Sequence, residues 1–270
     1  MFVSPMLLHS IDEPFDDDSY ISELKFDGIR LILSKFDNKI KLYSRHHNEV
    51  TTKFPELLDL DIPNGTVLDG EIIVINDKGV PDFEAVMERF MSSKSSHSIV
   101  YCIFDVIQLN GLSFAAKPLI ERKESLLSIG IDHPNAFVLE GIQGNGVSYF
   151  EMAKEKDLEG IVLKKADSTY EIGKRSRNWL KVINYQYTDV LITGYTHRDI
   201  KFLLSYLDGT AAGMMEFMPI SERKKFHSEK NIKSETEDFV FIEPIQCSVK
   251  HRFKTKHGKL RIPSFYKWRG

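Results

Sequence analysis

The sequence predicts an α+β protein in which a larger domain of antiparallel sheets with flanking helices is followed by a small β-barrel. Two observations lead to this prediction. Up to about residue 185, strand patterns are interspersed with three helical patterns. Beyond it, five strand patterns and one polar helix candidate occupy about 85 residues, which is typical of a small barrel. The 270 residues are enough for two such domains, which we place at 1–185 and 186–270.

The elements of the first domain follow from the spacing of apolar residues. Runs of apolar and β-branched residues bounded by turn residues predict strands within 20–50, with a turn at 36–39, and at 66–75, 99–109, 160–165 and 178–184. Asp82 can cap a helix with apolar residues at helical spacing, Pro118 starts a second helix that Gly130 stops, and Ser148 caps a third that runs to about residue 156.

The second domain is predicted from shorter patterns. Strands are expected at 189–195, 202–207, 214–217 and 239–248 and in the last segment, with a polar helix at 221–230. Gly209 and Gly213 lie between two of these strands. This content favours a barrel of the OB type.

Charge is distributed unevenly along the chain. The formal net charge is −3, but residues 244–270 hold eight Lys or Arg and no Asp or Glu. This asymmetry indicates a polyanionic partner. Candidate backbone contacts to a nucleic acid are Lys174, Arg175, Arg177, Lys250, Arg252, Arg261 and Arg269. A solvated basic surface is the alternative.

Cysteine content and hydropathy bear on the compartment. Cys102 and Cys247 are the only cysteines, and two distant cysteines form neither a disulfide framework nor a metal knuckle. We find no apolar run of about 18 residues, so no membrane span is expected. These features predict a cytoplasmic protein.

The strongest candidate for chemistry is the segment ELKFDGIR at residues 23–30, which contains K-x-D-G-x-R between strand patterns. Gly28 allows a backbone geometry that a side chain would block. Lys25 can act as a nucleophile if its amine is neutral, which nearby cations such as Arg30 and a metal ion would favour. The motif alone is also compatible with an exposed hairpin.

Later strands each carry a polar or aromatic residue at an edge. These residues are Arg45, Glu71 in LDGE, Phe104 in IFDV, Glu159 and Lys164 in EGIVLKK, and Lys181 in WLK. Singly, each is also typical of a solvated rim or, for Phe104, of a core. Together they describe one pocket, because carboxylates hold Mg²⁺ and ribose hydroxyls, lysines hold phosphates and an aromatic ring stacks on a base.

In this order and spacing, the motifs resemble those of the covalent nucleotidyltransferases, and most closely those of the small bacterial and phage ATP-dependent DNA ligases, including the ligase domain of bacterial end-joining ligases. The resemblance covers nearly the whole chain. It implies a nucleotidyltransferase (adenylation) domain followed by an OB-fold domain. It also implies that Lys25 attacks the α-phosphate of ATP to form a lysyl-AMP, from which AMP passes to a DNA 5′-phosphate before the nick is sealed.

The resemblance also implies roles for the other motif residues. Cofactor contacts are expected from Glu23 to the adenine edge, Arg30 and Arg45 to phosphate or the nick end, Glu71 to the ribose, Phe104 to the adenine face, and Lys164 and Lys181 to the α-phosphate. Glu159 and Asp27 would hold Mg²⁺ or Mn²⁺.

Two departures from the family pattern stand out. The family often has a lysine two residues after Lys181, where this chain has Ile183. The family's last motif is an arginine followed by an acid and a lysine, whereas residues 260–269 only approach it before the chain ends at Gly270. We therefore expect weak self-adenylation.

The expected partner is nicked double-stranded DNA, with a Ku-like end-joining protein as a further candidate, and we expect a monomer in a bacterial or phage setting, associated with the nucleoid. The alternatives are an RNA ligase or an RNA-capping guanylyltransferase of the same superfamily, and an inactive nucleic-acid-binding relative. Intact Lys25, Asp27, Glu71, Glu159 and Lys181 argue against the last.

Overall fold

The computed structural model of the chain describes residues 1–92 and 94–269. Over these residues the chain divides into two compact units, Met1–Asn184 and a second that begins at Tyr185. The boundary expected from the sequence lies one residue away. Gly270, at which the C-terminal motif was expected to break off, lies outside the described residues.

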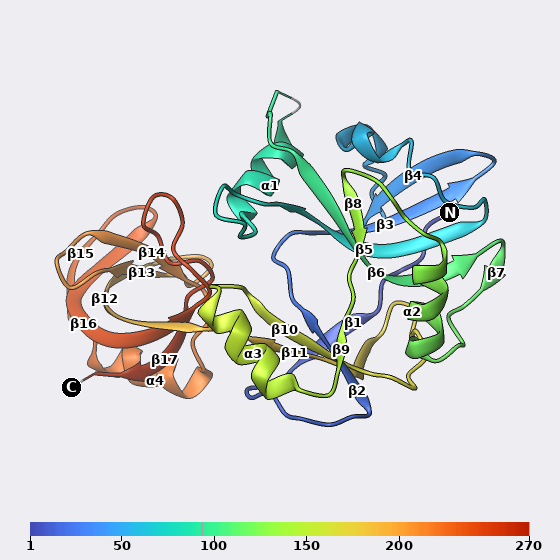
Figure 1. Cartoon of the computed structure of the whole chain (residues 1–270). Coiled ribbons are helices and arrows are strands. Elements are labelled where there is room, and N and C mark those ends of the chain that lie inside the picture. The colour runs from blue at the N-terminus through green and yellow to red at the C-terminus, as the bar shows by residue number, and fades with distance from the viewer. Residues whose placement is uncertain (93, 270) are drawn as a thin grey trace. The chain divides into compact units, whose positions relative to one another are not determined.

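One sheet of the first unit has the strand order β1-β11-β10-β2-β9 (Figure 1). Its strands are β1 (Leu7–Ser10), β2 (Tyr20–Leu24), β9 (Ile142–Gln143), β10 (Gly160–Lys165) and β11 (Arg175–Ile183). The strand predicted at 160–165 is confirmed, and β11 begins three residues before the strand predicted at 178–184. The edge strands β1 and β9 were not predicted because each is too short to show an alternation.

A second sheet of this unit has the order β4-β3-β5-β6-β7, with β8 paired to β6. Its strands are β3 (Ile29–Phe36), β4 (Lys39–Ser44), β5 (Thr66–Val74), β6 (Ile99–Leu109), β7 (Leu112–Ser113) and β8 (Ala136–Val138). Short 3₁₀ turns follow β4 at Thr51–Lys53 and Pro55–Leu57. The turn predicted at 36–39 is confirmed, because Asp37 and Asn38 join β3 to β4 in the left-handed region.

The period of two along each strand decides which side chains meet between the sheets. In β3, Leu31 and Leu33 pack into one core and Ile32 packs into another with Phe104 and Trp179. In β10, Ile161 and Leu163 pack with the residues of α3. Val162 and Lys164 therefore face the opposite side, toward the second sheet.

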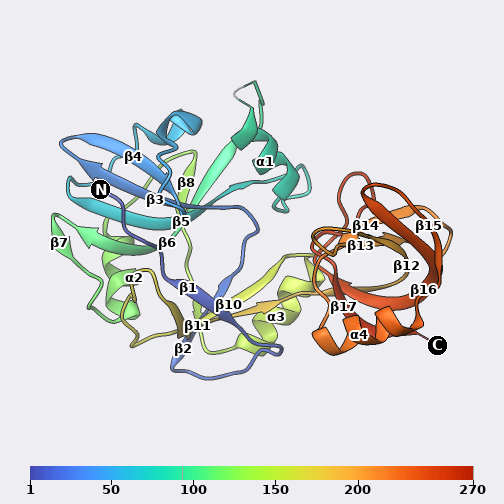
Figure 2. The ribbon, with the colours of Figure 1, turned by 180° about the vertical axis from the view of Figure 1, so that it is seen from behind.

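Three helices cover the sheets of the first unit among its described residues: α1 (Phe83–Met91), α2 (Leu119–Ser128) and α3 (Gly146–Glu155). Helix α2 packs on β6, and α3 packs on β10 and β2 (Figure 2). The predicted cap at Asp82 is confirmed, since its side chain accepts from the Ala85 amide at 2.9 Å.

The start of α3 differs from the prediction. Ser148 does not cap this helix, which begins at Gly146 after Asn145 in a left-handed conformation. The exposed amide of Val147 is instead satisfied by Asp16 Oδ1 at 2.9 Å. Gly146 permits a close approach, because a Cβ there would lie 2.3 Å from the Phe15 carbonyl oxygen. The cap thus comes from a distant loop, which local sequence cannot reveal.

The second unit is a curved antiparallel sheet with the order β14-β13-β12-β16-β15, and β17 also pairs with β16. Its elements are β12 (Gln186–Thr196), β13 (Phe202–Ser205), β14 (Ala211–Met215), α4 (Ile220–Glu229), β15 (Ile232–Glu235), β16 (Phe239–His251) and β17 (Ser264–Trp268). The polar strand β15 was not predicted. Across residues 1–92 and 94–269, none of the helices has the length and apolar character needed to span a bilayer.

Candidate active site

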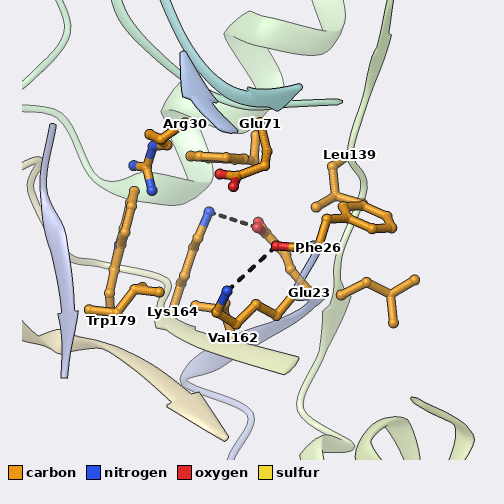
Figure 3. Close-up of a pocket in the computed structure, with 12 residues that line it drawn as sticks. Glu23, Phe26, Arg30, Glu71, Leu139, Val162, Lys164 and Trp179 are labelled. Atoms are coloured by element: carbon orange, nitrogen blue, oxygen red, sulfur yellow. Dashed lines mark hydrogen bonds and ion pairs between the residues drawn. The ribbon is translucent and has the colours of Figure 1, made fainter. Parts of the chain in front are cut away.

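A pocket lies between the two sheets of the first unit. Because β2, β3, β5, β6, β10 and β11 each turn alternate side chains inward, residues far apart in the sequence meet there (Figure 3). The lining residues are Leu8, Glu23, Leu24, Lys25, Phe26, Arg30, Glu71, Phe104, Leu139, Val162, Lys164 and Trp179. The pocket thus combines carboxylates, cations and three aromatic side chains.

Lys25 follows directly after β2, and its backbone amide donates to the Gly160 carbonyl oxygen at 2.9 Å. Its side-chain amine donates to Glu159 Oε2 at 2.7 Å. The next turn depends on Gly28, since a Cβ there would lie 2.1 Å from the Ile72 carbonyl oxygen. The expectation that a side chain would be blocked at this position is confirmed. The charge bonded to Lys25 is a carboxylate, whereas the sequence suggested surrounding cations.

Glu23 lies behind Lys25 on the inward side of β2 and is 1% exposed. Lys164 Nζ is 2.6 Å from its Oε2, and Lys123 Nζ is 2.5 Å from its Oε1. Burial alone would raise the pKa of Glu23, but the two ammonium groups outweigh it and hold the pKa below its ordinary value. Glu23 is therefore a buried carboxylate with a cation on each oxygen.

Arg30 is fixed by a second acidic group. Its Nε and Nη2 donate to Asp69 Oδ1 and Oδ2 at 2.5 and 2.6 Å, and Tyr170 donates to the same Oδ2 at 2.5 Å. The guanidinium carbon lies 4.4 Å from the centroid of the Phe104 ring. Burial lowers the pKa of Arg30, but Asp69 more than compensates and raises it. Arg30 is thus a fixed cation at the pocket wall.

Unlike the pKa of Glu23, that of the Glu71 carboxyl in the same pocket is raised. Burial raises its pKa to about 7; Lys25 and Arg30 oppose this rise, and Glu159 and Asp27 add to it. Near neutral pH this side chain therefore exists in both forms. As an acid it can donate a hydrogen bond, and as a carboxylate it can only accept one.

The raised pKa of Glu71 predicts a pH-dependent stability difference. Between pH 4.5 and 7 the folded chain holds a proton on Glu71 that the unfolded chain has lost, so this group's contribution to stability falls as the pH rises. Glu71→Gln cannot titrate. Its free energy of unfolding relative to wild type should therefore increase by roughly 2–3 kcal/mol from pH 4.5 to pH 8. Urea unfolding of both proteins at the two pH values measures this, and a constant difference would contradict it.

The structure brings several predicted residues together and leaves others apart. Glu23, Lys25, Arg30, Glu71, Phe104 and Lys164 line the pocket, and Glu159 reaches it through Lys25. Arg45 is exposed, with its Nε 3.0 Å from His46 Nε2, and is absent from the lining. Lys181, half-buried on β11 opposite Val162, is absent from it too.

Three residues around the pocket were not singled out from the sequence. Asp69 was detectable as an acid inside an otherwise apolar strand. Lys123 was detectable because residues 119, 122, 123 and 126 lie on one face of a helix and include two cations. In the structure this whole face of α2 is buried. Tyr170 lies in an irregular segment and gives no local signal.

The predicted nucleic-acid contacts are distributed over both units. Lys174, Arg175 and Arg177 are exposed at and just before the start of β11. In the second unit, Lys250 Nζ lies 4.8 Å from the Tyr185 ring centroid, and Arg261 lies 4.8 Å from that of Phe253. These two and Arg252 are half-buried, and Arg269, which is exposed, donates from its Nε to Asp189 Oδ1 at 3.0 Å.

The chain matches the family model of the ATP dependent DNA ligase domain over residues 5–182. It is 75% identical over 269 residues to the SPbeta prophage-derived DNA ligase-like protein LigB of Bacillus subtilis strain 168, with 100% of each chain covered. It is 27% identical to the multifunctional non-homologous end joining protein LigD of Mycolicibacterium smegmatis, over 92% of this chain and 35% of that protein. The chain therefore spans about a third of that relative.

Solved structures show the same fold. The mycobacterial DNA ligase D complexed with ATP and MES aligns with a TM-score of 0.63 at 22% identity, covering 99% of this chain and 95% of that one. A Lig E DNA ligase aligns with a TM-score of 0.66 at 18% identity, covering 98% and 99%. The match to the family model over residues 5–182 and the 75% identity to LigB show that the chain belongs to the ATP-dependent DNA ligase family.

Proposed function

We propose that this chain seals nicks in duplex DNA through a lysyl-AMP on Lys25 and a 5′-adenylated DNA. The observation that carries the proposal is the position of the Lys25 amine, which lies at the pocket wall and is held by Glu159 at 2.7 Å. Lys25 is held by a backbone hydrogen bond to β10 and by a buried carboxylate. Its amine therefore loses little conformational entropy when it meets a bound phosphate.

The proposed reaction has three balanced steps. The neutral Lys25 amine attacks the α-phosphorus of ATP, so that a P–N bond forms, the P–O bond to pyrophosphate breaks and the nitrogen releases a proton to water. An oxygen of the DNA 5′-phosphate then attacks the same phosphorus, the P–N bond breaks, and the lysine nitrogen takes up a proton as it leaves. Finally, the 3′-hydroxyl attacks the activated 5′-phosphate, loses its proton and releases AMP. In each step the protein positions the groups and neutralises charge.

The pocket offers a group for each part of the nucleotide. Phe104 presents a ring to the base and Glu23 a carboxylate to its edge. Glu71 can donate to or accept from a ribose hydroxyl near neutral pH. Arg30 and Lys164 supply positive charge for phosphate oxygens, with Lys181 as a further candidate. The Lys25 amine donates to Glu159 and has to be neutral when it attacks.

The acidic residues fit a divalent cation. Within the described part of the chain, no three His, Cys, Asp or Glu side chains already form a metal cluster. However, Glu159 and Asp27 both raise the pKa of Glu71, so three carboxyls share one region beside the nucleophile. Carboxylate oxygens are the ligands that Mg²⁺ prefers. Asp27 and Glu159 would hold the ion, which would neutralise charge on the phosphates.

We assign the second unit to an OB-fold that contacts the DNA backbone. Its antiparallel sheet, with a helix between β14 and β15, supports this assignment. Lys250 and Arg261 supply positive charge beside aromatic rings, and Arg252 adds a further cation. A Ku-like partner and a monomeric state stay predictions.

A ligation assay tests the proposed function. A nicked duplex with a labelled 5′-phosphate should be sealed with ATP and Mg²⁺, and not with GTP or with EDTA present. Sealing of a nicked RNA in preference to DNA would favour the RNA ligase alternative, and a guanylate adduct would favour the capping enzymes. Binding of the duplex without any adduct would indicate an inactive relative.

The departure at Ile183 leads to a prediction on the first step. Ile183 is 5% exposed, so the position of the family's second lysine carries a buried apolar side chain. With one cation fewer for phosphate, adenylation from ATP should be slower than later steps. A nick made with pre-adenylated DNA should therefore be sealed faster than the same nick with ATP, by roughly tenfold or more. Equal single-turnover rates in the two assays would contradict this.

A further inference from the structure

The buried cation on the far side of Glu23 has no role in the proposed reaction so far. Lys123 lies on α2 and is 8% exposed. Its Nζ is 2.5 Å from Glu23 Oε1 and donates to the Leu139 carbonyl oxygen at 3.0 Å. It does not line the pocket itself. Burial of an ammonium group costs desolvation free energy, so we look for the role of Lys123 in the Glu23 carboxylate that it neutralises.

The opposite oxygen of Glu23 is held by a side chain that the nucleotide is expected to recruit. Lys164 Nζ is 2.6 Å from Glu23 Oε2 and lies 4.4 and 4.2 Å from the ring centroids of Phe104 and Trp179 (Figure 3). Lys164 therefore lies over the Phe104 ring, which is expected to stack on the base. A base stacked on that side of the ring would displace Lys164, and the phosphates would offer it a new partner.

We propose that Lys123 is a positioning residue for nucleobase selection: it keeps Glu23 in place as a carboxylate when Lys164 moves to the phosphates. The inference rests on the proposed function and deepens it. Adenine presents an exocyclic amine, a donor, where guanine presents a carbonyl oxygen, an acceptor. A carboxylate only accepts, so Glu23 bonds the first and repels the second. With both lysines gone, a buried carboxyl would take up a proton and could then bond either base.

The test is the rate of lysyl-nucleotide formation over a range of ATP and GTP concentrations. In Lys123→Met, the KM for ATP should rise by about tenfold or more, while kcat changes by less than about threefold. The preference for ATP over GTP should fall by about tenfold or more. Lys123→Arg, which keeps the charge, should retain most of the wild-type preference. Lys117→Met removes an exposed cation just before the same helix and should change neither quantity.

A double-mutant cycle separates positioning from general damage. In a Glu23→Gln background, adding Lys123→Met should leave the ATP KM and the ATP-to-GTP preference unchanged, because the residue through which Lys123 acts is already neutral. The double variant contains no unpaired buried carboxylate at this position, so it can be studied even if Lys123→Met alone does not fold. Thermal unfolding shows whether each variant is folded.

Three results would overturn the inference. The first is a folded Lys123→Met protein whose ATP KM and ATP-to-GTP preference equal those of wild type, provided that wild type forms its adduct. A further loss of preference in the Glu23→Gln background would show that Lys123 acts elsewhere. If wild type formed no adduct with either nucleotide, the proposed function would fail first and this inference with it.

Discussion

Lys25→Ala should abolish ATP-dependent nick sealing, with a loss of roughly a thousandfold or more, because it removes the amine that is proposed to form the covalent intermediate. The same variant should still seal a nick made with pre-adenylated DNA, since the third step needs no lysine nucleophile. Gel assays of the two substrates, run side by side, measure both activities. The contrast between them separates a missing nucleophile from a misfolded pocket.

Matched variants sharpen this result. Lys25→Arg keeps a cation beside Glu159 but offers no usable nucleophile, so it should fail with ATP as alanine does. Lys154→Ala, an exposed lysine on α3 paired with Glu151, should leave both activities unchanged. If Lys25→Ala sealed the ATP-dependent substrate at a rate near that of wild type, the assignment of the nucleophile would be wrong.

Arg122→Met should destabilise the first unit more than any surface change, by about 3–5 kcal/mol. Both members of the Arg122–Asp105 pair are fully buried, and the guanidinium donates to both carboxylate oxygens at 2.8 and 2.9 Å. It also donates to the Lys117 and Ser168 carbonyl oxygens. The substitution leaves Asp105 as an uncompensated buried charge. Since a domain is stable by only about 5–15 kcal/mol, urea unfolding should show a large shift of the midpoint.

The double variant Arg122→Met with Asp105→Leu supplies the control. It removes both charges, so it should recover part of the stability lost in Arg122→Met. Lys154→Met breaks an exposed pair and should change the free energy of unfolding by less than about 1 kcal/mol. An Arg122→Met protein as stable as wild type would show that the buried pair contributes nothing.

Much of the pocket was predictable because its residues sit in elements with strong local patterns. Single polar or aromatic residues stand out at the edges of otherwise apolar strand patterns, and their types and order allowed Glu23, Glu71, Phe104 and Lys164 to be assigned to one pocket before any coordinates. The turn at Asp37 and the cap at Asp82 were also predictable, since each uses only neighbouring residues.

The rest depends on contacts between distant segments, which a local pattern does not contain. The cap of α3 comes from Asp16, and the acid that fixes Arg30 is itself held by Tyr170, far along the chain. Strands such as β9 and β15 are too short or too polar to show an alternation and form only by pairing with a neighbour. Lys123 was overlooked because a lysine in a helix is usually solvated; its place in a core-facing stripe was the available signal.

Peptide-mapped mass spectrometry after incubation with ATP and Mg²⁺ tests the central claim most directly. The account predicts an added AMP, about 329 Da, on the peptide containing Lys25, sensitive to acid as a phosphoramidate is, and absent from Lys25→Ala. An AMP on another residue, or an adduct that persists in Lys25→Ala, would contradict it.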